Sequence, residues 1–155
     1  MPDLGAFEAK FQPDARIGSS SNPATHFIDN FYTASGAGQL QAVKLSKMKR
    51  SYFYLSVQND GEIGDDLSLN GTSANRTLRL TALDLSSGGA NITAQLATGK
   101  VFAALAAGEV AVVQVDVKAR SKKVRARQTL GYSVRSSLSP SVDTVVAKVT
   151  QKKAR

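Results

Sequence analysis

The chain has 155 residues, a formal net charge of +8, and neither cysteine nor tryptophan. The lack of cysteine excludes disulfides, thiolate nucleophiles and cysteine-ligated metal sites. No stretch approaches about 18 consecutive apolar residues, so the sequence predicts no membrane-spanning helix, and the length suits one domain with its own hydrophobic core.

The N-terminal segment differs in character from the rest of the chain. Residues 1–14 read MPDLGAFEAKFQPD, without the basic and then apolar order of a signal peptide, so the sequence predicts none. Residues 4–11 are the best helical candidate, but a helix this short is marginal on its own. We therefore expect residues 1–12 to form an N-terminal arm.

The rest of the chain alternates between apolar and polar residues with the period of two that is typical of β-strands. In residues 109–119, for example, Val113, Val115 and Val117 fall on one face. Gly, Asn and Asp cluster between such runs, which favours turns. The strands predicted in this way are 26–32, 41–46, 51–59, 66–71, 76–83, 91–96, 101–105, 109–119, 128–136 and 142–150. The pattern predicts an all-β sandwich or barrel over residues 13–150, followed by a basic tail, 151–155.

Four stretches resemble parts of an immunoglobulin-like β-sandwich module of bacterial surface and exported proteins. They are PDARIGSSSNPATHFIDNFYTASGAGQ (13–39), SYFYLSVQNDGEIGDDLSLNG (51–71), LAAGEVAVVQVDV (105–117) and SVRSSLSPSVDTVVAKV (133–149). The resemblance implies an immunoglobulin-like antiparallel β-sandwich with an adhesive, spacer or structural role. It also implies a location that is extracellular or on the cell surface, and it brings no catalytic residues and no cofactor.

Charge is distributed unevenly along the sequence. Residues 58–85 carry five acidic side chains against two basic ones, whereas residues 100–155 carry twelve basic side chains against three acidic ones. This asymmetry predicts a basic face and a more acidic face. A basic face raises the rate of encounter with anionic partners.

The densest basic stretch is KARSKKVRAR, which lies between two predicted strands and departs from the usual pattern of the module. One interpretation is a solvated loop that aids solubility. The other is a contact with an anionic partner, which would relieve the repulsion among the basic side chains. The residues of this predicted contact are Lys118, Arg120, Lys122, Lys123, Arg125 and Arg127.

Several partners fit such a contact: nucleic acid, an acidic cell-surface polymer, a lipid headgroup layer, or the acidic surface of a neighbouring subunit. The stretch contains no aromatic residue that would stack on a base, so specific nucleic-acid readout is not expected. An acidic surface on a second copy of the chain is attractive because the chain carries its own acidic turn. Such a contact is heterologous and builds rings or filaments.

The acidic turn is NDGEIGDD, residues 59–66. Its carboxylates are a weak candidate for a calcium site, because Ca²⁺ takes about six to eight oxygen ligands. The alternative, which we favour, is turn chemistry, since Asn, Asp and Gly adopt the backbone conformations that turns need. The calcium candidates are Asp60, Glu62, Asp65 and Asp66, and we expect no cofactor.

The sequence offers little for catalysis. It has one histidine, His26, near Asp29, and no recognisable nucleophile motif, so we expect no enzyme and interpret His26 as a partly exposed strand residue. In FIDNFYT (27–33), we interpret the aromatic rings as part of the core and not as a recognition patch.

These observations predict a non-enzymatic structural subunit of a larger surface or extracellular assembly, which binds other protein subunits. Association would use strand edges, charge complementarity and residues 1–12, which would add a strand to a neighbour's exposed sheet edge. The alternatives are a polyanion-binding module that uses residues 118–127 and a decoration subunit of a virus particle.

Overall fold

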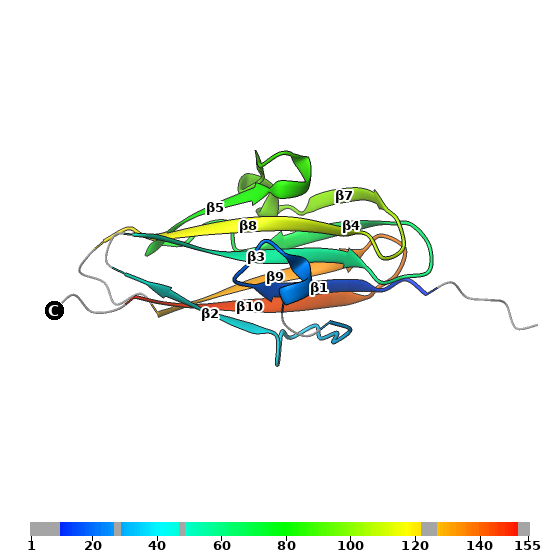
Figure 1. Cartoon of the computed structure of the whole chain (residues 1–155), viewed down its shortest axis with the longest axis horizontal. Helices are drawn as coiled ribbons and strands as arrows, with labels where there is room; N and C mark the ends of the chain where they lie inside the picture. The colour runs from blue at the N-terminus through cyan, green and yellow to red at the C-terminus, as the bar shows by residue number, and fades with distance from the viewer. Residues whose placement is uncertain (1–9, 27–28, 47–48, 122–126, 152–155) are drawn as a thin grey trace, which may run out of the picture.

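The structure is a computed structural model that describes residues 10–26, 29–46, 49–121 and 127–151. The described residues form an all-β domain of two five-stranded sheets packed face to face (Figure 1). In order across the first sheet, the strands are β1 (Pro13–Gly18), β3 (Arg50–Asn59), β8 (Val110–Ala119), β5 (Leu78–Asp84) and β6 (Ala90–Asn91). Across the second sheet they are β2 (Leu40–Leu45), β10 (Val142–Gln151), β9 (Arg127–Ser136), β4 (Asp65–Gly71) and β7 (Lys100–Leu105).

Three short 3-10 helices complete the described structure: η1 (Pro23–Thr25), η2 (Leu85–Ser87) and η3 (Ala94–Ala97). No helix among the described residues has the length and apolar character needed to cross a membrane.

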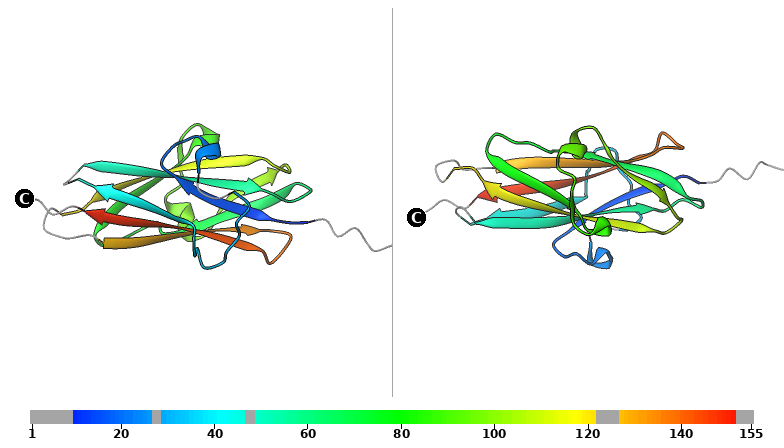
Figure 2. Two further views of the ribbon diagram at one scale, coloured as in Figure 1. Left: turned by 60° about the horizontal axis from the view of Figure 1, so that its bottom comes forward. Right: turned by 90° about the horizontal axis from the view of Figure 1, so that it is seen from above.

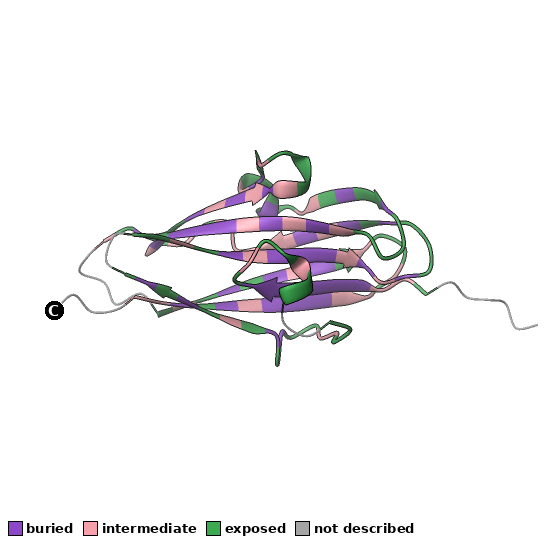
Figure 3. Cartoon of the chain, in the orientation of Figure 1, coloured by how far each residue is buried: buried purple, intermediate pink, exposed green. Residues whose placement is uncertain are grey.

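The predicted alternation builds the core between the sheets. The inward positions of β3, β8, β9 and β10 are almost fully buried, whereas most of the residues between them are more exposed (Figure 3). Burying each such Val, Leu or Phe side chain stabilises the fold by about 1.5–3 kcal/mol. Phe53 of β3 meets Tyr132 of β9 edge to face across the sandwich, with ring centroids 5.8 Å apart. The sequence-based prediction of an all-β sandwich is confirmed at this level.

One strand pair departs from the antiparallel arrangement. β2 pairs with β10 in parallel, with Leu40 opposite Val146 and Leu45 opposite Gln151, whereas the other described pairs are antiparallel. The reason is that the chain does not reverse between β1 and β2. Residues 19–39 carry it from the first sheet to the second, and it then continues in the direction of β10.

The sequence-based strand boundaries were wrong in two places and missed one strand. Residues 26–32 contain no strand among the described positions, and residues 91–96 largely form the turn around η3. The unpredicted strand is β1, which lacks alternation because all six of its residues are buried, including Asp14 and Arg16.

Side chains, and not a sheet ladder, hold the segment that was predicted as strand 26–32. Gln39 Nε2 donates to Phe31 O at 2.6 Å and to the buried Asp143 carboxylate at 2.7 Å. The same carboxylate accepts the Thr33 N–H, directly after the segment, at 2.7 Å. Asn30 has a φ of 58°, which breaks an extended conformation. Phe31 is 42% exposed, so the expectation that the rings of this segment lie in the core was wrong for Phe31.

The sandwich has two distinct ends. The connections 59–65, 105–110 and 136–142 lie at the end where β1 begins, and β2, β4 and β8 finish at the opposite end, where β10 also finishes (Figures 1 and 2). At the first end, residues 10–12 run beside the 59–65 connection: Gln12 O accepts the Asp60 N–H at 2.8 Å, and Lys10 O accepts the Glu62 N–H at 2.9 Å. Residues 1–9 and 152–155, which hold most of the predicted arm and tail, lie outside the described residues.

Candidate functional site

A row of basic residues crosses the outer face of the first sheet. Strand register places Arg50 of β3 opposite Lys118 of β8, and Lys118 opposite Arg79 of β5. All three side chains are exposed, because they occupy positions that alternate with buried core residues. Two residues after Lys118, Arg120 follows on the same face. The result is a basic patch, which we define as Arg50, Arg79, Lys118 and Arg120.

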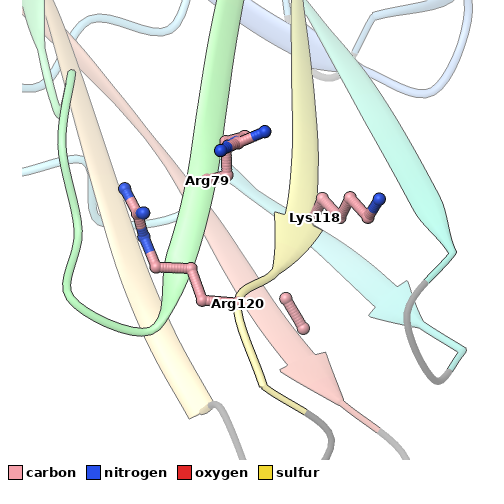
Figure 4. A pocket seen from close by; sticks show the side chains of 4 residues that line it. Arg79, Lys118 and Arg120 are labelled. Carbon is pink, nitrogen blue, oxygen red and sulfur yellow. The ribbon is translucent and has the colours of Figure 1, made fainter.

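The patch encloses a shallow pocket of about 240 Å³, lined by Arg79, Lys118, Ala119 and Arg120 (Figure 4). Arg120 is positioned by the backbone, because its Nε donates to Leu78 O at 3.0 Å and to Asn75 O at 3.2 Å. These bonds leave the rest of its guanidinium beside the pocket. A second hollow of about 60 Å³ adjoins the first and shares Arg79 and Lys118 with it.

The charges of the patch are only partly compensated. Arg50 Nη1 lies 3.1 Å from Asp116 Oδ2. Within the described part of the chain, Arg79 and Lys118 make no ion pair. Like charges directly opposite each other on neighbouring strands are destabilising. An anion in this pocket would therefore stabilise the folded chain.

The structure divides the six residues of the predicted basic contact. Lys118 and Arg120 line the pocket, and Arg127 is exposed at the start of β9, in the other sheet but at the same end. Lys122, Lys123 and Arg125 lie outside the described residues.

Sequence reasoning missed half of the patch. Arg50 and Arg79 belong to other strands, and only the register brings them beside Lys118. The same register places Tyr52 opposite Asp116, one step along the same face, and Tyr52 is 52% exposed. Its ring meets Tyr54 edge to face, with centroids 5.7 Å apart. An aromatic surface, absent from residues 118–127, thus adjoins the patch from β3.

The four predicted calcium candidates have different partners. Asp65 is buried and accepts from the hydroxyls of Ser136 and Ser137, and Asp66 Oδ1 accepts the Ala104 N–H at 2.6 Å. Glu62 Oε2 accepts the Lys10 N–H at 3.4 Å. Asp60 accepts from the Tyr32 hydroxyl at 2.7 Å. Their arrangement is that of a turn with capped backbone, and it does not gather the four carboxylates around one point.

His26 differs from its sequence-based interpretation. It follows η1 instead of lying in a strand, and it is buried. Its Nδ1 lies 2.9 Å from Ser56 Oγ, and its Nε2 lies 2.7 Å from Ser20 O. Burial lowers the pKa of His26, the Arg16 charge lowers it further, and the Ser20 carbonyl opposes this shift. Both ring nitrogens therefore have partners, and the ring ties the η1 segment to β3.

No family model matches this sequence, and no curated protein matches it. Among solved structures, a family 123 glycoside hydrolase from Clostridium perfringens is similar with a TM-score of 0.52 at 8% identity, over 92% of this chain and 28% of that chain. A FixG-related protein from Vibrio parahaemolyticus has a TM-score of 0.45 at 11% identity, over 90% and 96% of the two chains. The Vibrio cholerae VesB protease has a TM-score of 0.43 at 10% identity, over 73% and 30%.

The likeness to the glycoside hydrolase concerns the fold alone, because the identity is only 8%. This chain spans less than a third of the hydrolase and of the VesB protease, at 28% and 30% of their lengths.

Proposed function

We propose that this chain is a non-enzymatic structural subunit that assembles head to tail, with the basic end of one molecule against the acidic end of the next. The observation that carries the proposal is the separation of exposed charge between the two ends of the sandwich. Resemblance to surface modules favours an extracellular or cell-surface assembly as its setting.

The two ends differ in sign among the described residues. Exposed basic side chains gather at the end where β10 finishes: Lys44, Lys49, Arg50, Arg76, Arg79, Lys118, Arg120, Arg127 and Lys148. At the other end, exposed acidic side chains lie on neighbouring turns, at Glu62, Asp66 and Glu109, and they outnumber the exposed basic side chains there, Lys10 and Arg135. Because one surface is basic and a different one is acidic, each molecule offers both halves of a heterologous contact.

We also propose that the sandwich is immunoglobulin-like, and the strand order supports this. Apart from β2, β6 and β7, the first sheet runs β1-β3-β8-β5 and the second runs β4-β9-β10. Lettered A to G in chain order, these are A-B-E-D and C-F-G. That is the arrangement of immunoglobulin constant-type domains, which serve widely as structural and adhesive modules. The contacts of both His26 nitrogens support a structural role for this residue and agree with a non-enzymatic function.

Charge complementarity of this kind is sensitive to salt. A pair of exposed charges at 4 Å is worth about 1 kcal/mol in water, and screening acts over about 10 Å at 0.1 M salt. A contact made of several such pairs therefore forms at low ionic strength and weakens as salt rises. Assembly is expected at about 0.05 M NaCl and should decline by about 0.5 M.

Two double variants test the proposal. Arg79→Glu with Lys118→Glu disables the basic end, and Glu62→Lys with Glu109→Lys disables the acidic end. By light scattering, each variant alone should remain a monomer of 16.4 kDa at low salt, while the wild type forms larger particles. An equimolar mixture pairs opposite charges at both contacts, the native pair at one and the exchanged pair at the other, so it should assemble again into particles larger than a monomer.

A wild-type chain that is monomeric at both salt concentrations would overturn the head-to-tail proposal. So would particles that persist in both double variants. The part that residues 1–12 take in assembly stays a prediction, because nine of these residues lie outside the described structure.

Exposed Tyr52 beside the basic patch favours a second function, binding of an anionic polymer. Basic side chains neutralise the anionic groups of such a polymer, and single-stranded nucleic acids also stack their bases on neighbouring aromatic rings. The probe is heparin, a sulfated polysaccharide. Binding that weakens steeply with salt and is lost in Lys118→Glu, with a monomeric wild type, would favour this function over self-assembly.

A further inference from the structure

Three carboxylates from separate segments meet at the acidic end of the sandwich. Asp14 comes from β1, Asp29 from the segment after η1, and Asp60 from the turn after β3. Each offers one oxygen, and the three oxygens lie within 4.8 Å of one another. Among the calcium candidates taken from the sequence, Asp60 alone belongs to this group.

Asp14 is a buried carboxylate whose oxygens lack hydrogen-bond donors in the part of the protein that the structure describes. Its exposed fraction is 0%, and neither of its carboxylate oxygens accepts a hydrogen bond within the described structure. One oxygen, Oδ2, lies 3.1 Å from Arg16 Nε. Buried carboxylates are normally satisfied by donors, because burying one without them is costly. Asp143 shows the contrast, since four N–H groups donate to its carboxylate.

The charges around the cluster match a divalent ion. Arg16 contacts two of the three carboxylates, with Nη1 at 3.4 Å from Asp29 Oδ1. One positive charge against three negative ones leaves a net charge of −2. Burial, then the Asp60, Asp143 and Asp29 charges, raise the pKa of Asp14 to about 7, against the lowering effect of Arg16. The ionised cluster is therefore poorly stabilised by the protein alone.

Neutral oxygen atoms lie close by. The Tyr32 hydroxyl donates to Asp60 Oδ2 at 2.7 Å and lies 3.0 Å from Asn30 Oδ1. Three carboxylates, neighbouring neutral oxygens and water make up the all-oxygen ligand set that calcium prefers. Magnesium demands a near-ideal octahedron, which an arrangement drawn from three irregular segments does not favour.

We propose that Asp14, Asp29 and Asp60 form a calcium-binding site that joins β1, the segment after η1 and the turn after β3. The site is independent of the head-to-tail contact and adds a structural ion to the fold. The neighbouring Arg16 weakens cation binding, so the dissociation constant belongs in the range of extracellular calcium modules, about 0.1–1 mM.

The first test measures calcium binding to the full chain after EDTA treatment and dialysis, at pH about 8, where carboxylates are ionised. Isothermal titration with CaCl₂ should show one site. At calcium ten times the dissociation constant, the Tm should rise by about 3–5 °C. MgCl₂ should bind more weakly. Terbium provides an optical readout, because Tyr32 lies against the site and tyrosine sensitises terbium emission.

The decisive variant is Asp29→Asn, because this side chain is 56% exposed and its replacement does not threaten the core. Calcium affinity should fall by about tenfold or more, since affinity depends on the number of ligand charges. Glu109→Gln is the matched control: it removes one exposed charge from the same end and should leave affinity unchanged. Asp14→Asn should abolish the calcium-induced rise in Tm while raising the Tm measured in EDTA.

Two results would overturn the site. One is no heat of binding and no Tm change up to about 10 mM CaCl₂, well above the expected dissociation constant. The other is an equal loss of affinity in Asp29→Asn and Glu109→Gln, which would indicate diffuse attraction of cations to the acidic end. Neither result bears on assembly, which the charge-reversal variants test separately.

Discussion

The carboxylate of Asp143 in β10 accepts a hydrogen bond from the backbone N–H of Ala15 in β1, at 2.7 Å. This bond links the first strand of one sheet to the last strand of the other. The opposite oxygen accepts from Thr33, Gln39 and Thr144. A single buried side chain therefore holds β1 and the segment that leads into β2.

We predict that Asp143→Ala lowers the free energy of unfolding by about 2–5 kcal/mol, because the N–H groups of Ala15 and Thr33 lose their acceptor. The Thr144 N–H and Gln39 Nε2 each keep a second acceptor, Thr33 O and Phe31 O. Asp143→Asn should lower the free energy of unfolding by less, since its single amide oxygen can still accept some of these hydrogen bonds. Urea denaturation measures both changes. The exposed Asp66 accepts a hydrogen bond from Ala104, and Asp66→Ala serves as the control. If Asp143→Ala lowers the free energy of unfolding no more than Asp66→Ala does, the prediction is wrong.

Gly71 and Gly131 form a matched pair of glycines at adjacent positions in paired strands. A Cβ on Gly71 would overlap the Tyr132 ring and lie 2.9 Å from Gly131 O, whereas a Cβ on Gly131 would meet nothing within 4 Å. Gly71→Ala should therefore cost about 1–3 kcal/mol, because Tyr132 is held by Phe53 and cannot move away freely. Gly131→Ala should be neutral or stabilising by up to about 1 kcal/mol. Thermal unfolding of the two variants measures this difference, and equal changes in Tm would refute the overlap.

His26 makes stability fall at mildly acidic pH. Its pKa in the folded chain lies below the ordinary value of 6.5, because the ring is buried near Arg16. As pH falls through about 6.5, the unfolded chain takes up a proton on this ring and the folded chain does not, so folding becomes less favourable. Above about pH 6.5 the ring is neutral in both the folded and the unfolded chain, so this loss of stability is absent.

Comparison with His26→Gln isolates the effect. The raised pKa values of Asp14 and Asp143 act in the opposite sense, with stability lost as pH rises, but they are common to both proteins. Relative to His26→Gln, the wild type should lose unfolding free energy between pH of about 7.5 and about 5. Parallel stability curves for the two proteins over this range would show that His26 does not titrate as described.

Repulsion within the basic patch should lower the free energy of unfolding of the isolated chain. Lys118 lies directly between Arg50 and Arg79, so Lys118→Glu replaces two repulsions with two attractions. We expect the free energy of unfolding to rise by about 0.5–1 kcal/mol at low salt. The gain should shrink at about 0.5 M NaCl, where exposed charges are screened. A gain that is independent of salt would point to packing instead of charge.

The β-sandwich was predictable because alternation is a local signal, and the inward residues of β3, β8, β9 and β10 follow it closely. β1 was missed because it is enclosed on both faces, so Asp14 and Arg16 are buried beside Ala15 and Ile17. The pattern of polarity then no longer reports the face on which a residue lies.

The candidate sites were only half predictable, because each combines residues that are distant in sequence. Lys118 and Arg120 stand out in a basic run, but Arg79 joins them only through the β5–β8 register. Likewise, Asp60 stands out in an acidic turn, while its neighbours in space, Asp14 and Asp29, are single acids in other segments. Sequence density identified two of the four patch residues and one of the three carboxylates, and the fold supplied the others.

The chain enters the sandwich at one end, through β1, and leaves it at the other, through β10 (Figure 1). Tension applied between these two points would run along the strands, perpendicular to the ladder hydrogen bonds. β10 is bonded on both sides, to β9 and to β2, so many hydrogen bonds would bear the load together in shear. Such an arrangement resists extension better than one in which strands unzip bond by bond, and in the proposed head-to-tail row it would transmit mechanical force from one subunit to the next without unfolding.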